Sequence, residues 1–262
     1  MTFSPVEGER LLERLRTAGC VFAEDEAAVL MDAATTPDEL ESMVRRRVGG
    51  LPLEQVVGWA AFHGLRIVVE AGVFVPRRRT ELLVDEAVAL APARALVVDL
   101  CCGSGAVGAA VAAARPDIAL HAADIDPAAV RCARRNIAID AGDVHEGDLF
   151  DALPDDLRGR VDVVVACAPY VPREAIGLMP PEARLHEPLA ALDGGLDGLD
   201  IVRRMADGCG DWLAPGGRLI VEASEDQAAE VVGHFARRDL RGRIVSSQQL
   251  GATVVVGTAA RS

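Results

Sequence analysis

The stretch "VVDLCCGSGAVG" (residues 97–108) joins an apolar run of β-branched character to an alanine-rich run through a turn of small residues. Gly103 and Gly105 allow the backbone to turn tightly and to come close to a ligand, while the helix that follows presents free N–H groups. One Gly-x-Gly pair is weak evidence, because many such pairs only turn the chain. The order of strand, turn and helix nevertheless predicts an α/β unit.

The chain on either side of this turn continues the alternation of strand and helix. Strands are expected at 95–100, 118–124, near Val144, at 161–166 and at 217–224, and helices at 81–91, 105–114, 126–136, 199–213 and 226–238. The segments 242–247 and 252–259 are expected to form a terminal antiparallel pair. Such alternation specifies a mostly parallel sheet with helices on both faces, and ligands of these sheets sit outside the carboxyl ends of the strands.

The first third of the chain has a different character. Capping signals occur at Ser4 with Pro5 and at Thr36 with Pro37 and Glu39, and predict helices. Residues 56–75 change to period-2 patterning, which favours a hairpin. We therefore expect a helical domain at 1–50, a β-hairpin linker at 51–75 and an α/β domain at 76–262.

Composition excludes several classes of protein. The formal net charge of −13 over 262 residues argues against direct nucleic-acid binding, which requires a basic surface. The six cysteines form no CxxC pair, so we expect neither a disulfide framework nor a metal site. The first residues lack an apolar signal core and no apolar run approaches the roughly 20 residues that span a bilayer. These features predict a cytoplasmic protein that does not associate with membranes.

Carboxylates follow two more strands of the predicted sheet. Asp124 lies some 20 positions after the glycines, where an acid commonly binds ribose hydroxyls, and Asp126 is better interpreted as a helix cap. Asp148 follows the third strand, where a carboxylate can accept from an adenine amino group. Together these residues indicate a nucleoside site. No phosphate-binding GxxxxGK[ST] motif is present, and NAD is not excluded by these features alone.

The stretch "VDVVVACAPYVP" (residues 161–172) resembles the "(N)PPY" loop of S-adenosylmethionine-dependent amino-methyltransferases. The wider chain, over nearly the whole of its catalytic half, resembles one branch of them, the HemK/PrmC-type protein N5-glutamine methyltransferases, which modify the glutamine of peptide-chain release factors. The resemblance extends over "LPLEQVVGWAAFHGLRIVVEAGVFVPRRRTELLV", "DLCCGSGAVGAAVA", "ADIDPAAVRCARRN", "GDLF" and "EPLAALDGGLDGLDIVRRM". It implies a Rossmann-like class I methyltransferase that binds S-adenosyl-L-methionine, with a small helical N-terminal domain that docks a protein substrate.

The resemblance also implies roles for individual residues. The methionine part of the cofactor is expected against Asp99, Cys101, Cys102, Gly103, Ser104 and Gly105, the ribose at Asp124, and the adenine at Asp148 and Leu149. Cys167, Ala168, Pro169 and Tyr170 are expected to line the point of methyl transfer and to hold the acceptor. Arg77 and Glu81 are expected to help close the site.

The sequence departs from the family pattern at the chemistry itself. Cys167 occupies the position of the asparagine whose side-chain oxygen accepts an N–H of the substrate, and a thiol is a weak acceptor. Ala168 replaces the first proline, Cys101 the first glycine, and Arg78 and Arg79 a Pro-acid pair. Three hypotheses follow: slower glutamine methylation, a different amine, amide or small-molecule acceptor, or a catalytically degenerate homologue that still binds the cofactor.

Overall fold

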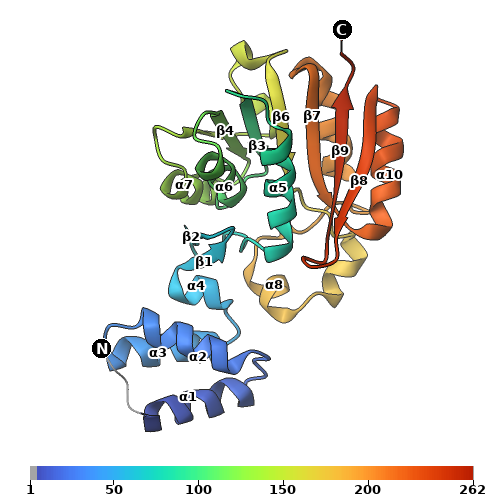
Figure 1. The fold of residues 1–262 in the computed structure, drawn as a ribbon. Coiled ribbons are helices and arrows are strands. Elements are labelled where there is room, and N and C mark those ends of the chain that lie inside the picture. Colours follow the sequence, from blue (N-terminus) through green and yellow to red (C-terminus); the bar gives the residue numbers. More distant parts are fainter. Residues whose placement is uncertain (1–4, 262) are drawn as a thin grey trace.

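The computed structural model describes residues 5–261 of the chain, so the cap predicted at Ser4 lies outside the described residues. The helical domain consists of α1 (Pro5–Thr17), α2 (Ala23–Ala33) and α3 (Pro37–Val48). These helices bury Leu15, Leu30 and Val44 between them. Thr36 caps α3 as predicted, since its hydroxyl accepts from the Glu39 N–H at 3.2 Å. The three helices form a separate layer below the sheet (Figure 1).

The segment between the two parts is a short helix followed by a hairpin. Helix α4 (Leu53–Val57) ends at Gly58, whose φ of +83° lies in the left-handed region. The strands β1 (Trp59–Phe62) and β2 (Leu65–Val68) then pair antiparallel. The predicted hairpin is therefore present but shorter than residues 56–75.

The rest of the chain is built around a seven-stranded sheet, with the strand order β5-β4-β3-β6-β7-β9-β8. Its strands are β3 (Leu96–Leu100), β4 (Ala119–Asp124), β5 (Gly142–Glu146), β6 (Val161–Ala166), β7 (Leu213–Ala223), β8 (Leu240–Ser247) and β9 (Ala252–Ala259). The pairs from β5 to β7 are parallel, and β9 runs antiparallel to both β7 and β8. The chain moves outward from β3 in one direction and from β6 in the other, so the topological switch point lies between these two strands.

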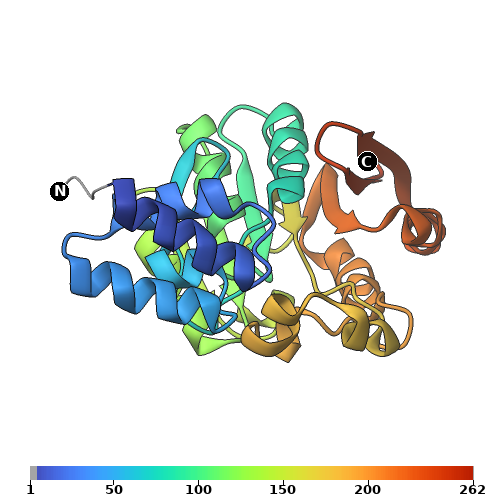
Figure 2. The same cartoon turned by 90° about the horizontal axis from the view of Figure 1, so that it is seen from below.

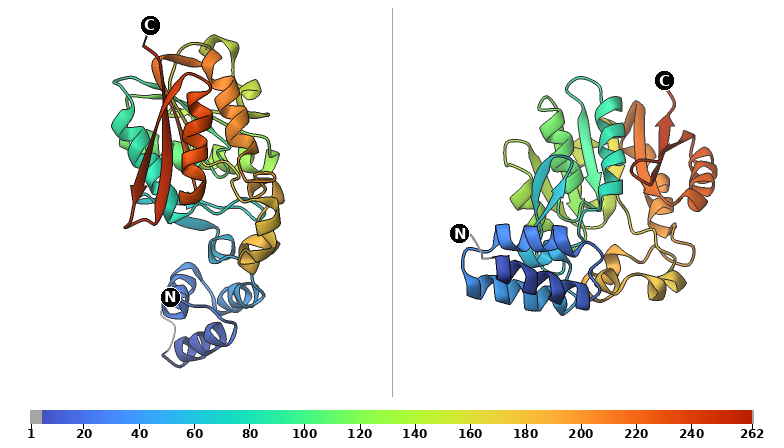
Figure 3. Two further views of the ribbon diagram at one scale, coloured as in Figure 1. Left: turned by 90° about the vertical axis from the view of Figure 1, so that its right-hand side faces the viewer. Right: turned by 60° about the horizontal axis from the view of Figure 1, so that its bottom comes forward.

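Helices cover both faces of this sheet (Figure 3). Helices α5 (Glu81–Leu90), α6 (Ala106–Ala114) and α7 (Pro127–Asn136) pack on one face, and α9 (Asp200–Gly208) and α10 (Glu225–Ala236) on the other. Alternate residues of each strand enter the two cores: Val97 and Val163 face the first, Val98 and Val164 the second. Buried parallel strands are apolar on both faces, which explains their continuous runs of valine and alanine.

A segment of short helices connects β6 to α9 on the side of the helical domain (Figures 1 and 2). The remaining short helices of the chain are η1 (Arg78–Thr80), η2 (Leu149–Ala152), η3 (Asp155–Leu157), η4 (Arg173–Leu178), α8 (Pro181–His186), η5 (Leu189–Ala191) and η6 (Cys209–Asp211). Buried Arg47 of α3 donates to Glu26 at 2.5 Å and to Glu182 of α8 at 2.7 Å. The helical domain is thus tied to the segment that follows β6.

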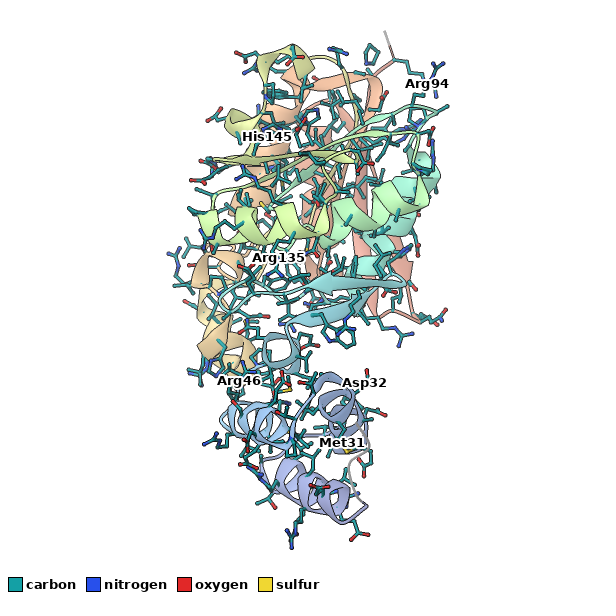
Figure 4. All side chains as sticks on the ribbon, turned by 90° about the vertical axis from the view of Figure 1, so that its left-hand side faces the viewer. Met31, Asp32, Arg46, Arg94, Arg135 and His145 are labelled. Atoms are coloured by element: carbon teal, nitrogen blue, oxygen red, sulfur yellow. The ribbon has the colours of Figure 1, made fainter. Side chains whose placement is uncertain are left out.

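The neighbouring Arg46 lies on the side of the helical domain nearest the rest of the chain (Figure 4), and donates to the Val56 carbonyl at 2.8 Å. Among residues 5–261, no helix is long and apolar enough to cross a membrane.

Candidate active site

The turn after β3 adopts three left-handed residues. Cys101, Gly103 and Gly105 have φ of +54°, +55° and +76°. A side chain at Gly103 would meet no atom within 4 Å, whereas one at Gly105 would lie 3.0 Å from the Cβ of Ala133. Gly103 therefore leaves open space above the backbone, and Gly105 allows α7 to pack closely.

Asp99 lies beneath this turn at the end of β3. Its side chain is 1% exposed, one carboxylate oxygen accepts from the Gly108 N–H at 2.8 Å, and the other has no partner among the described residues. Burial raises the pKa of Asp99 to about 7, with the nearby charge of Asp124 acting in the same direction. A buried oxygen without a donor matches a site that takes a positively charged group.

Asp124 and Asp126 occupy different roles at the end of β4. The Asp124 carboxylate accepts from the Gly103 N–H at 2.8 Å and from the Asp126 N–H at 2.9 Å, and burial raises its pKa. Asp126 caps α7 by accepting from the Ala128 N–H at 2.8 Å. The cap predicted at Asp126 is confirmed, and Asp124 remains at the ligand-facing end of the strand.

The third acid, Asp148, follows β5 and accepts from Arg204 of α9 at 2.7 Å. Leu149 next to it has a φ of +49°. The preceding Gly147 packs against η2, since an added Cβ would lie 2.9 Å from that of Ala152. These contacts bring the turn after β5 against helix α9.

A cavity of about 270 Å³ joins these strand ends. Its lining includes nine of the predicted site residues: Cys101, Cys102, Gly103, Ser104, Asp124, Asp148, Leu149, Cys167 and Pro169. Asp99, Gly105, Ala168 and Tyr170 belong to the same two turns but are not among the residues that line the cavity. The cavity's size, its open glycine turn and the unpaired oxygen of Asp99 fit a bound nucleoside with a cationic amino-acid tail.

The loop after β6 is held from outside the cavity. Val171 bonds directly to the "DGGLDG" segment, since the Gly194 N–H donates to its carbonyl at 2.9 Å. Tyr170 is joined to the same segment through Gln227 of α10, whose side-chain amide donates to the Tyr170 carbonyl at 3.0 Å and to the Asp197 carbonyl at 2.9 Å. Gly194 and Gly198 allow this approach, because a Cβ on either would overlap the backbone of residues 169–170. The backbone geometry of the loop is therefore set by its neighbours.

Glu222 of β7 is a buried carboxylate behind this loop, with 2% of its surface exposed. One of its oxygens accepts from Arg79 and from the Tyr170 hydroxyl, both at 3.0 Å. The other accepts from the Thr80 hydroxyl at 2.6 Å and lies 3.6 Å from the Cys167 sulfur. Burial, together with the Glu222 charge, raises the pKa of the Cys167 thiol well above its ordinary value, so the thiol stays protonated.

Arg77 and Glu81 lie outside the cavity lining. Arg77 pairs with the buried Glu187 at 2.5 Å, and Glu81 accepts from the His63 N–H of the hairpin at 3.0 Å. Glu81 thus joins the hairpin to the start of α5, and Arg77 joins the chain before α5 to the end of α8.

Sequence reasoning missed Glu222 and Arg204 as site residues. A single acid near the end of the apolar strand "RLIVEA" was the available signal for Glu222, because a buried charge requires partners. Arg204 gave no signal, since it is one of many arginines on helix surfaces. No group of three or more His, Cys, Asp or Glu side chains within residues 5–261 is arranged to hold a metal ion.

The strand order with its antiparallel β9, the glycine turn and the acids at successive strand ends define a class I S-adenosylmethionine-dependent methyltransferase. A methyltransferase from Pyrococcus furiosus has the same fold, with a TM-score of 0.56 at 14% identity over 75% of this chain and 90% of that one. The family model "Methyltransferase small domain" matches residues 64–179.

Two curated relatives define the chain more closely. It is 37% identical over 234 residues to the release factor glutamine methyltransferase of Geobacter sulfurreducens, covering 87% of this chain and 81% of that protein. It is 38% identical over 212 residues to the 4-amino-L-phenylalanine/4-methylamino-L-phenylalanine methyltransferase of Streptomyces pristinaespiralis, covering 78% and 71%. The chain belongs to the release factor glutamine methyltransferase family, and its cofactor is S-adenosyl-L-methionine.

Proposed function

We propose that this protein methylates the side-chain amide nitrogen of a glutamine in a protein substrate, and that the substrate is a peptide-chain release factor. The observation that carries the proposal is the position of the loop after β6: its residues Cys167 and Pro169 line the same cavity as the glycine turn and the acids Asp124 and Asp148. Relatives named as release factor glutamine methyltransferases support this acceptor.

The residues of the cavity, and those of the turn beneath it, divide by the part of the cofactor they would hold. Asp99 and the turn from Cys101 to Gly105 face the methionine part, Asp124 the ribose, and Asp148 with Leu149 the adenine. When bound, the cofactor supplies an electrophilic methyl group on a sulfonium. The unpaired Asp99 oxygen would accept from the cofactor's ammonium group.

The loop residues act on the acceptor. An amide nitrogen is a poor nucleophile, because its lone pair is delocalised into the carbonyl, so its orientation contributes much of the rate. The backbone carbonyl of Ala168 accepts one N–H of the amide, and Pro169 restricts the loop. Tyr170 bonds to Glu222, which fixes its ring at the edge of the loop.

The helical domain at 1–50 is the proposed docking site for the protein substrate. Val21 and Phe22, between α1 and α2, are 83% and 68% exposed, and Leu185 and Leu189 near α8 are 64% and 61% exposed. Exposed apolar side chains on the helical domain and around α8 support a protein partner that contacts both. The Arg47–Glu182 ion pair holds these two parts of the chain together. Release factors act in the cytoplasm, so this proposal places the enzyme there.

A second candidate is N-methylation of a small aromatic amine. The Streptomyces pristinaespiralis relative is named for 4-amino-L-phenylalanine, and an aryl amine has no carbonyl to be oriented. Cys167 favours this candidate, since a thiol provides less hydrogen bonding to an amide than an asparagine would.

The experiment that tests the proposal is transfer of a labelled methyl group from S-adenosylmethionine to purified release factors and to 4-amino-L-phenylalanine. Label on the release factor that disappears when its tripeptide-loop glutamine is changed to alanine supports the proposed acceptor. Label only on the amine supports the second candidate. Binding of S-adenosylhomocysteine without transfer to either acceptor would indicate a homologue that has lost catalysis.

A further inference from the structure

Two segments of the chain meet at Glu222, residues 79–80 and residues 167–170, and each contributes one side chain that also lines the cavity. Thr80 and Cys167 both line the cavity, and both have their polar atom near the same Glu222 oxygen. A buried carboxylate is unfavourable unless it is paired and hydrogen-bonded, and here the paired cation is Arg79. The arrangement raises the question of what the carboxylate does for the cavity.

The distances assign the proton of the Thr80 hydroxyl. The hydroxyl lies 2.6 Å from the Glu222 oxygen and 3.8 Å from the Cys167 sulfur, so its one proton is donated to the carboxylate. A hydroxyl group has one proton and two lone pairs. With its proton committed, the Thr80 oxygen presents only lone pairs to a donor in the cavity.

The Cys167 thiol does not provide an equivalent acceptor. Its sulfur lies 3.6 Å from the same Glu222 oxygen, and sulfur is a weak hydrogen-bond acceptor. The Thr80 oxygen is therefore the strongest side-chain acceptor at this end of the cavity among the described residues that line it.

We infer that Thr80 is a catalytic residue whose hydroxyl oxygen accepts an N–H of the methyl acceptor, and that Glu222 is a positioning residue that fixes this hydroxyl. The inference rests on the proposed function, because it assigns a role at the same site. Thr80 and the Ala168 carbonyl then hold the two N–H groups of a primary amide or amine, which directs the nitrogen lone pair at the methyl group.

The same contacts provide a path for the proton. The nitrogen lone pair forms the N–C bond while the S–C bond breaks and its electrons stay on sulfur. The nitrogen then releases one proton to the Thr80 oxygen, and Thr80 passes its own proton to Glu222. Glu222 becomes a neutral acid as the sulfonium charge disappears, so the charge of the site is balanced.

Arg79 and Tyr170 keep Glu222 in place for this role. Both donate to the oxygen that Thr80 does not use, at 3.0 Å each. The carboxylate is thereby held in one rotamer with the other oxygen directed at Thr80.

The test uses Thr80→Val, which keeps the shape of the side chain and removes the hydroxyl, with Thr80→Ser as the variant that restores it. We expect Thr80→Val to lower kcat by about 10- to 100-fold, since loss of one oriented hydrogen-bonding group in a transition state has effects of this order or larger. Thr80→Ser should recover kcat to within about threefold of the wild type. Glu222→Gln should lower kcat to an extent similar to Thr80→Val. Thr253→Val is the matched control: Thr253 is also buried and bonds Ser246 at 3.0 Å, outside the site.

A binding measurement separates this role from a purely structural one. Affinity for S-adenosylhomocysteine, measured by calorimetry, should be unchanged in Thr80→Val. Affinity of the acceptor for the S-adenosylhomocysteine-loaded enzyme should fall about fivefold, the effect of one neutral hydrogen bond. Wild-type kcat and acceptor affinity in a folded Thr80→Val variant would overturn the inference, as would failure of Thr80→Ser to restore activity.

The acceptor used decides which proposal fails. If the wild type methylates 4-amino-L-phenylalanine and not a release factor, the glutamine proposal is wrong, and the variants are measured with the amine, for which the same losses are expected. If the wild type methylates neither, both the proposed function and the role of Thr80 are contradicted.

Discussion

Gly198 is the residue of the chain at which one added methyl group should disturb the transfer loop most directly. Its φ is +82°, and a Cβ at this position would overlap the Tyr170 carbonyl and the side-chain amide of Gln227. In Gly198→Ala, the left-handed backbone costs about 1–2 kcal/mol, the lost Gln227–Tyr170 hydrogen bond about 1 kcal/mol, and relief of the overlap about 1–3 kcal/mol. We expect a total destabilisation of about 3–6 kcal/mol.

Differential scanning calorimetry tests this magnitude. For a domain of this size, 1 kcal/mol corresponds to about 2–4 °C, so Tm should fall by roughly 10 °C. The residual folded enzyme should lose kcat more than cofactor affinity, because the displaced backbone belongs to the loop and not to the glycine turn. Gly177→Ala is the control, since Gly177 lies in the same connecting segment with no atom within 4 Å of an added Cβ. A Gly198→Ala protein with the Tm and kcat of the wild type would refute the reasoning.

Three further predictions concern other parts of the chain. Cys101→Gly should raise the free energy of unfolding, measured by urea denaturation, by up to about 1 kcal/mol, because Cys101 has a strained φ of +54°. Cys102→Gly, at a position without that strain, should lower the free energy of unfolding. Equal effects of the two substitutions would contradict the strain at Cys101. Burial raises the Asp99 pKa to about 7, so the free energy of unfolding that the protonated acid contributes is complete below its ordinary pKa of 3.8 and is lost as pH rises through 7. The free energy of unfolding of Asp99→Asn should therefore rise relative to that of the wild type between these pH values. Parallel pH profiles of the two proteins would refute the assignment. Arg47→Met should lower Tm, since it leaves Glu26 buried without its cation, and should raise KM for a protein acceptor more than KM for the cofactor. The control is Arg14→Met, which breaks an exposed pair with Glu41. Equal effects of the two substitutions would contradict a special role of Arg47.

The order of strands and helices could be predicted because the pattern of the catalytic part is strong. The apolar runs 96–100 and 161–166 are valine-rich, and buried parallel strands require this on both faces. The start of helix α7 followed from Asp126 and Pro127, which are a cap and a first-turn proline. The topology then placed the predicted acids at one edge of the sheet.

The parts that could not be predicted depend on contacts between distant segments. Residues 173–196 carry no periodic pattern, and their short helices are defined by packing against the loop after β6 and the helical domain. The role of Glu222 depends on Thr80 and Cys167, which lie 142 and 55 positions away in the sequence. Pattern reasoning identifies residues at the ends of their own strands, whereas a buried carboxylate acquires its partners only through the fold.

The most direct test of the account is to locate the transferred methyl group. A purified release factor is incubated with the wild-type enzyme and S-adenosylmethionine, digested, and examined by tandem mass spectrometry. The account predicts one added methyl group on the side chain of the glutamine in the tripeptide loop, and none when the enzyme is omitted. An unmodified glutamine, with S-adenosylhomocysteine binding demonstrated for the same enzyme preparation, would contradict it.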